Sequence, residues 1–352
     1  MRVVFRVDSS LQIGSGHVMR CLTLAKGLRK NGADVIFICR KLTGNLASKI
    51  NDSGFKVFEL KLSDKKIIDN KLFHSKWLEV TQLLDSEQSK DIIKKIKPDW
   101  LIVDHYALDH EWELKLKPYV KYLMVIDDLA DRRHECDLLL DQTLGRKKED
   151  YDELVPKLCK MLLGASFCLL RSEFAKWRPY SIDRRIYPKF QNLLINMGGF
   201  DITNNTMDIL DKLPECLLPS DLKITIVLGQ NSPNFHRLND KIKMLDLDVV
   251  VKIDVDNMAE IMANSDIAIG AAGSTSWERC CLGLPTVQFI LAQNQQFLGK
   301  MLMQNNAALT ANKPEKMKDF LSTVPTWMQS VSSSAARVTD GTGASKVIEN
   351  IV

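Results

Sequence analysis

Short apolar runs alternate with helical patterns along the whole chain, and this alternation is the feature that most constrains its fold. Strands that alternate with helices form parallel sheets with right-handed crossovers. The alternation starts again after residue 188, so we expect an α/β protein with two such domains. The runs interpreted as buried strands are 3–7, 33–39, 56–60, 100–103, 122–126 and 138–140 in the first half, and 192–197, 223–228, 249–253, 267–269 and 285–290 in the second.

The length of 352 residues also suits two domains of ordinary size. Between them, the segment 178–188 contains two prolines and mixed charge, which is typical of a linker. We therefore predict an N-terminal domain over 1–177, a linker over 178–188, a second domain over 189–330 and a helical tail over 331–352.

Composition narrows the classes of function. Apolar residues make up 45 % of the chain and charged residues 26 %, as in globular proteins, and the net charge of +4 is weak support for a nucleic-acid partner. No apolar run approaches the length of a membrane span, and no signal-type segment begins the chain. The eight cysteines are scattered without Cys-x-x-Cys spacing. We expect a cytoplasmic protein with reduced core cysteines, no nucleic-acid partner and no membrane insertion.

The junction between the first strand and the first helix carries Gly14, Gly16 and His17. Glycines let the backbone approach a ligand, and the free N–H groups of a helix start favour an anion. An imidazole at this position can act as a base at neutral pH. We predict that the chemistry occurs at His17, with Gly14 and Gly16 beside the ligand. The alternative is an ordinary polar residue at a helix start.

A nicotinamide-type dinucleotide site is excluded by the same stretch. Its fingerprint needs a third glycine where this chain has Met19, and an acid near the end of the second strand, where this chain has Arg40.

Polar side chains follow two more of the expected strands. In parallel sheets, ligands bind beyond the carboxyl ends of the strands. Asp104 and Tyr106 follow the fourth strand, and we expect them on the same edge as His17. Asp127 and Asp128 follow the fifth strand, and we interpret both as helix caps or turn formers.

Two strand-to-helix junctions of the second half repeat the glycine pattern. One contains Gly199, and the other contains Gly273, Ser274 and Thr275, whose N–H and hydroxyl groups suit a diphosphate. Glu278, one turn later, would repel phosphate but can accept hydrogen bonds from both hydroxyls of a ribose. We predict a nucleotide site here, with a merely capped turn as the alternative.

Metal binding is not expected. Asp254 and Asp256 resemble a metal-binding pair only superficially, because they precede a helix, where capping is the commoner role.

Four separated motifs support a resemblance to a known family. They are Ile-Gly-Ser-Gly-His17-Val-Met-Arg, Val-Asp104-His-Tyr, Asp127-Asp-Leu-Ala-Asp-Arg and Gly270-Ala-Ala-Gly-Ser-Thr-Ser-Trp-Glu. In these motifs the chain resembles the PseG/SpsG-type UDP-sugar hydrolases of pseudaminic acid biosynthesis, relatives of the MurG-like glycosyltransferases with the GT-B fold. The resemblance implies two Rossmann-like domains whose parallel sheets face an interdomain cleft.

The resemblance also implies a reaction and its residues. UDP would be released from UDP-2,4-diacetamido-2,4,6-trideoxy-β-L-altropyranose by water attacking the anomeric carbon, with inversion and without a metal or other cofactor. The family's catalytic histidine falls on His17, its substrate-contacting tyrosine and asparagine on Tyr106 and Asn294, and its ribose-binding glutamate on Glu278. Ser172 and Lys346 depart from the proline and arginine that are usual in relatives.

Two other functions fit the same architecture. A GT-B glycosyltransferase would use a sugar or lipid hydroxyl in place of water. A non-catalytic module would bind the UDP-sugar without consuming it.

Overall fold

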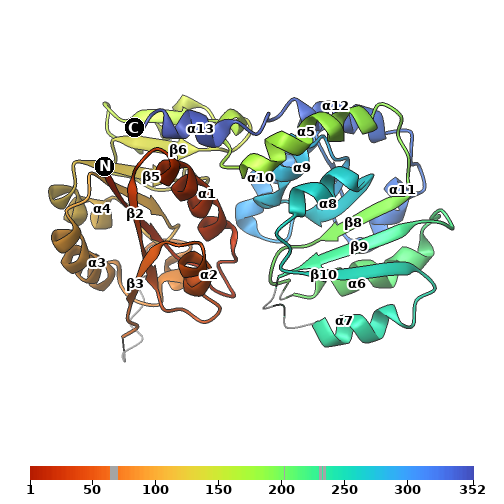
Figure 1. Cartoon of the computed structure of the whole chain (residues 1–352), viewed down its shortest axis with the longest axis horizontal. Coiled ribbons are helices and arrows are strands. Elements are labelled where there is room, and N and C mark those ends of the chain that lie inside the picture. The colour runs from red at the N-terminus through yellow and green to blue at the C-terminus, as the bar shows by residue number, and fades with distance from the viewer. Residues whose placement is uncertain (64–69, 202, 230–231, 233–234) are drawn as a thin grey trace. The chain divides into compact units, whose positions relative to one another are not determined.

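The computed structural model of the chain forms two compact units (Figure 1). The structure describes residues 1–63, 70–201, 203–229, 232 and 235–352. The first unit comprises Met1–Leu169 together with Gly343–Val352, and the second comprises Leu170–Thr342.

In the first unit, the described residues form one parallel sheet of seven strands. The order places β1 and β4 side by side at the point where the strand order reverses. In sheet order the strands are β3 (Lys56–Leu60), β2 (Asp34–Arg40), β1 (Arg2–Val7), β4 (Trp100–Asp104), β5 (Tyr122–Ile126), β6 (Leu138–Asp141) and β7 (Lys160–Leu163).

Helices cover both faces of this sheet, because both faces are apolar. Alternate strand residues point to opposite faces. Phe5 and Ile102 pack with α1 (Gly16–Lys30), α2 (Ala47–Asp52) and α13 (Gly343–Ile348). Their neighbours Val4 and Leu101 pack with α3 (Gln82–Ile96) and α4 (His110–Leu116).

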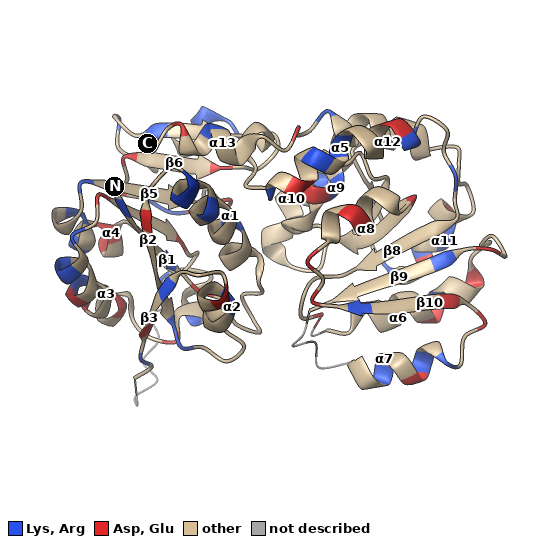
Figure 2. Cartoon of the chain, viewed as in Figure 1, with Lys and Arg blue, Asp and Glu red and all other residues tan. Residues whose placement is uncertain are grey.

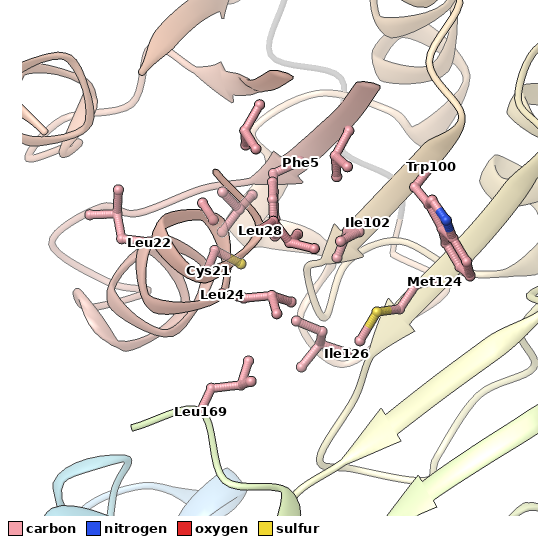
Figure 3. Packing of buried hydrophobic residues seen from close by; sticks show 14 of the residues in the cluster. Phe5, Cys21, Leu22, Leu24, Leu28, Trp100, Ile102, Met124, Ile126 and Leu169 are labelled. Atoms are coloured by element: carbon pink, nitrogen blue, oxygen red, sulfur yellow. The ribbon is translucent and has the colours of Figure 1, made fainter. Parts of the chain in front are cut away.

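The apolar side of α1 fixes that helix against the centre of the sheet. Figure 3 shows Leu24 and Leu28 of α1 gathered with Phe5 of β1, Ile102 of β4 and Ile126 of β5. All five side chains are fully buried. Because α1 is held in this way, its first turn has a defined position at the carboxyl ends of β1 and β4.

The second unit repeats the plan. Its described residues form a six-stranded parallel sheet, in which β8 and β11 meet where the order reverses. In sheet order the strands are β10 (Asp248–Ile253), β9 (Lys223–Leu228), β8 (Asn192–Asn196), β11 (Ile267–Ala271), β12 (Thr286–Phe289) and β13 (Leu309–Thr310). The helices are α5 (Ser172–Arg184), α6 (Asn205–Lys212), α7 (Phe235–Ile242), α8 (Met258–Asn264), α9 (Thr275–Cys281), α10 (Gln296–Gln304), α11 (Met317–Leu321) and α12 (Met328–Ala336). The predicted α/β class with parallel sheets is confirmed in both units.

The segment 178–188, expected to be a linker, is helical as far as Arg184. Pro179 removes one helical N–H donor, but tertiary contacts outweigh this loss. Arg178 donates to the carbonyls of Cys281 and Ala336, and Ser181 donates to the carbonyl of Leu282. The structure thus places α5 in the second unit from its first residue.

The C-terminal tail belongs partly to each unit. Of the tail predicted to be helical, α12 lies in the second unit and α13 in the first. Val347, Ile348 and Ile351 are buried in the same core as α1. The last ten residues therefore complete the core of the first unit.

Charged residues lie mainly on helices and loops, while the strands of both sheets carry few (Figure 2). Helix α3 carries both acidic and basic side chains, and its Lys94 and Lys95 are exposed. All eight cysteines are free thiols and buried. Among the described residues, none of the helices combines the length and the apolar character that crossing a membrane requires.

Candidate active site

His17 and Asp104 meet at the carboxyl edge of the first sheet, between β1 and β4. His17 is the second residue of α1, and Asp104 is the last residue of β4. Open α/β sheets bind ligands at the point where the strand order reverses, because the loops diverge there. The position of these two residues is therefore the one at which this fold usually binds a ligand.

A short hydrogen bond orients the His17 ring. Its Nδ1 lies 2.6 Å from Oδ1 of Asp104, whose side chain is fully buried. Burial alone would raise the pKa of Asp104, but the charge of Arg20 and the hydrogen bonds from Arg20 and His17 hold that pKa well below its usual range. A carboxylate on Nδ1 favours the tautomer with the proton there. Nε2, which has no hydrogen-bond partner in the described part of the chain, is left as an acceptor.

Arg20 connects this pair to a second carboxylate. Its Nε and Nη2 donate to the two oxygens of Asp104 at 2.6 and 2.7 Å. Its Nη1 donates to Oδ2 of Asp128. Both oxygens of Asp104 are thus engaged by protein groups, an arrangement that suits this carboxylate to orienting His17. A direct contact of Asp104 with the substrate stays a prediction.

Tyr106 lies edge-on to His17, with ring centroids 4.6 Å apart and planes at 81°. Its hydroxyl donates to Oδ2 of Asp128 at 2.8 Å. Burial, followed by the negative charge of Asp128, raises the pKa of Tyr106 well above its usual value. The hydroxyl therefore keeps its proton and donates it in a hydrogen bond to the Asp128 carboxylate.

Two more aromatic side chains complete the surroundings of His17. Trp77 stacks on Tyr106 at 5.5 Å, and His74 contacts the rings of both Trp77 and Tyr106. Burial lowers the pKa of His74 to about 4, so this ring is neutral at physiological pH. His74 directly precedes η1 (Ser75–Leu78), and Trp77 lies within it. The apolar pattern over 77–96 predicts a single helix, but the structure separates η1 from α3.

The loop before His17 is a tight turn. Gly14 has φ of +82°, and its N–H donates to the carbonyl of Ser10 at 2.9 Å. A side chain would be strained in this conformation, although the space beside Gly14 is open to 4 Å. Gly16 is the first residue of α1.

A buried ionic cluster holds the base of the same loop. Arg6 donates to both oxygens of Asp8 and to Asp85, and all three side chains are fully buried. Oδ1 of Asp8 also accepts the backbone N–H of Arg40 at 2.6 Å. These contacts tie the ends of β1 and β2 together behind the His17 loop.

In the second unit, Gly199 and Gly273 lie on the loops that follow β8 and β11, the two strands at which the order reverses. The carbonyl of Gly199 accepts the N–H of Gly229 at 2.8 Å. A Cβ at Gly229 would lie 2.5 Å from that oxygen, so the two glycines pack backbone to backbone.

The loop after β11 presents unused donors. Among the described residues, no partner accepts the N–H of Gly273 or Ser274, and the Ser274 side chain is exposed. Arg279 fixes the loop from behind, donating to the Ala271 carbonyl at 2.7 Å and to the hydroxyl of Thr275 at 3.1 Å. Successive free N–H groups of this kind form an anion-binding concavity.

Glu278 lies in α9, and its side chain is 18 % exposed. Burial raises the pKa of Glu278 to about 7, while Arg171, 3.8 Å away, opposes this shift. Its oxygens have no hydrogen-bond partner in the described chain. A mostly buried carboxyl group without such partners is suited to accept hydrogen bonds from a polyol.

Asn294 lies in η6 (Gln293–Gln295), in the second unit, whereas the other predicted substrate-binding residues lie in the first. Its neighbour Gln295 accepts the N–H of Leu291, and a Cβ on Gly273 would lie 3.9 Å from Nε2 of Gln295. The segment that carries Asn294 therefore borders the loop with the free N–H groups.

Sequence reasoning missed several residues of the first site. Arg20 stands three residues after His17, a spacing that places both on one helix face, and this was the available signal. Asp128 had been interpreted as a turn former together with Asp127. That role fits Asp127, which accepts the N–H groups of Leu129 and Ala130, but Asp128 instead binds Arg20 and Tyr106.

Known proteins resemble the chain over most of its length. It is 32 % identical to the UDP-2,4-diacetamido-2,4,6-trideoxy-β-L-altropyranose hydrolase of Campylobacter jejuni over 84 % of this chain and 94 % of that protein. It is 21 % identical to the spore coat polysaccharide biosynthesis protein SpsG of Bacillus subtilis over 91 % and 86 % of the two chains. The family model of the glycosyltransferase family 28 C-terminal domain matches residues 197–331.

Solved structures agree on the architecture. MurG of Acinetobacter baumannii superimposes with a TM-score of 0.69 over 99 % of both chains, at 15 % identity. This likeness supports the GT-B fold alone.

Proposed function

Because the chain belongs to the PseG/SpsG-type family of UDP-sugar hydrolases, we propose that it releases UDP from UDP-2,4-diacetamido-2,4,6-trideoxy-β-L-altropyranose in pseudaminic acid biosynthesis. A water oxygen forms a bond to the anomeric carbon from the face opposite the diphosphate. The bond from that carbon to the phosphate oxygen breaks, and UDP departs with the electron pair. The product is the free sugar with inverted configuration.

In this proposal, His17 is the general base. The observation that carries it is the 2.6 Å contact between His17 Nδ1 and Asp104, which leaves Nε2 free to take a proton from water. A positioned base of this kind contributes about 10²–10⁴-fold in rate. Tyr106, together with Gly14, Gly16 and Asn294, is assigned to the sugar.

The second unit is proposed to bind UDP. The free N–H groups of Gly273 and Ser274, with the hydroxyl of Thr275, suit the diphosphate, and Gly199 lies on the adjacent loop. Glu278 suits the ribose hydroxyls. The proposed reaction uses no metal or cofactor and takes place in the cytoplasm, where thiols such as the eight buried cysteines stay reduced.

The test is NMR of the reaction with candidate UDP-sugars and no added acceptor. The proposal expects stoichiometric UDP and free sugar, with the inverted anomer formed first.

Glycosyl transfer is the second candidate, favoured by the match to a glycosyltransferase C-terminal domain. It would leave the UDP-sugar intact until an acceptor is supplied. Binding of UDP without any loss of substrate would point to a non-catalytic module and contradict both.

A further inference from the structure

Among the residues that the structure describes, Arg20 is the group that hydrogen-bonds to both carboxylates next to the proposed base, Asp104 and Asp128. Nε and Nη2 of Arg20 donate to Asp104, which is hydrogen-bonded to His17. Its Nη1 donates to Asp128, which accepts the hydrogen bond of the Tyr106 hydroxyl. Arg20 is 7 % exposed, so these are buried, charge-assisted hydrogen bonds. The geometry of the two rings thus depends on a single guanidinium group.

A second observation, the unpaired oxygen of Asp128, points independently to a role of this side chain in the site. Its Oδ2 accepts from both Arg20 and Tyr106, whereas its Oδ1 is buried and has no hydrogen-bond partner in the described part of the chain. An unpaired buried carboxylate oxygen costs free energy, and its retention calls for a reason. Asp127, its neighbour, pairs both oxygens and closes a turn.

We propose that Arg20 and Asp128 are positioning residues for the reaction, which hold the Tyr106 ring edge-on to the His17 ring and fix the direction of the Tyr106 hydroxyl. Arg20 aligns the two carboxylates, and Asp128 accepts the hydrogen bond donated by the Tyr106 hydroxyl. The Tyr106 oxygen therefore presents its lone pairs, and not its proton, toward the substrate. This inference rests on the proposed function.

The test is a double-mutant cycle of Asp128→Asn and Tyr106→Phe. If Asp128 acts through the tyrosine, Asp128→Asn lowers kcat about tenfold in the wild-type background, with KM and UDP affinity within twofold. In the Tyr106→Phe background the same change has less than a twofold effect on kcat. Asp131→Asn is the matched control, because Asp131 is half-exposed and, within the described part of the chain, its ion pair is with Arg132.

Arg20→Lys tests the bridge itself. A lysine is a point charge that cannot occupy both carboxylates, so kcat falls at least tenfold while UDP affinity is kept. If this variant does not fold, the Asp128 cycle decides alone, since it removes no buried cation. The proposal would be overturned if Asp128→Asn lowered kcat by the same factor in the wild-type and the Tyr106→Phe backgrounds. It would also be overturned if Asp128→Asn had the same kcat as the Asp131→Asn control.

A readout without turnover separates this inference from the proposed function. Asp128→Asn should shift the ¹³Cζ resonance of Tyr106, which reports the hydrogen bond of its hydroxyl. If the wild type consumes no UDP-sugar, the proposed function fails while this shift is still seen. An unchanged Tyr106 resonance together with normal hydrolysis by the wild type would contradict only the positioning role.

Discussion

Nδ1 of His17 lies 2.6 Å from Oδ1 of Asp104, although the two residues are 87 positions apart in the chain. The parallel pairing of β1 with β4 brings them together, because Asp104 ends β4 and His17 lies on the connection that leaves the carboxyl end of β1, at the same edge of the sheet. The carboxylate is buried and shared with Arg20, so it has no freedom to turn away.

Asp104→Asn tests this orientation. An amide can donate to Nδ1, which would put the ring proton on Nε2 and block the proposed base. We expect kcat to fall by about 10²–10⁴-fold with UDP affinity unchanged. Asp99→Asn, just before the opposite end of β4 and in a half-exposed pair with Lys121, should retain activity. Near-normal turnover of Asp104→Asn would contradict the orientation model.

UDP affinity should depend on pH through Glu278. The pKa of this group is raised to about 7 by burial, so its carboxylate form predominates above pH 7 and its protonated form below. Only the carboxylate can accept from both ribose hydroxyls, so affinity should fall up to about tenfold from pH 8 to pH 6. Calorimetric titrations measure this. Glu278→Gln should bind UDP more weakly, and the pH dependence that remains in this variant is that of UDP itself. If the variant and the wild type showed the same dependence of UDP affinity on pH, Glu278 would not be the ribose acceptor.

Trp77 should support the tyrosine. Its ring stacks on Tyr106, which faces His17, and such aromatic pairs contribute about 0.5–1.5 kcal/mol. Trp77→Ala should therefore lower kcat/KM about two- to tenfold, with less loss in Trp77→Phe. The control is Trp100→Phe, which should leave kcat/KM unchanged. Trp100 stacks on Tyr122, and these two residues begin β4 and β5, at the edge of the sheet opposite the site.

The C-terminal segment that follows α13 should stabilise the first unit. Ile351 is 6 % exposed and packs in the core that holds α1, whereas Val352 is 68 % exposed. Ile351→Ala should lower the free energy of unfolding by about 2 kcal/mol, and Val352→Ala should change it little. Urea unfolding followed by tryptophan fluorescence compares them, and equal midpoints would show that the tail contributes nothing.

The central strands of both sheets could be predicted because strands buried on both faces read as continuous apolar runs. β7 and β13 could not. β7 begins with the exposed Lys160 and is only partly buried, and β13 has two residues, too few to give a pattern. The apolar residues from Trp77 to Ile96 predict one continuous helix, but the structure interrupts it, because Glu79 adopts φ of +56° and Thr81 caps a new helix start.

The site was predictable as far as strand ends determine it. His17 and Asp104 follow paired strands, so their meeting follows from the topology. The partnership of Arg20 and Asp128 depends on the rotation of α1 about its axis and on one side-chain direction after β5, which periodicity does not encode. Asp127 and Asp128 are adjacent and chemically identical, yet Asp127 closes a turn, whereas Asp128 forms an ion pair with Arg20 in the site.

The most direct measurement is UDP release and UDP binding by His17→Asn in parallel. Asparagine keeps a polar side chain of similar reach but cannot accept a proton at neutral pH. We predict that release falls by at least about 10²-fold while UDP affinity stays within twofold of the wild type. Release at the wild-type rate would contradict the assignment of His17 as the base.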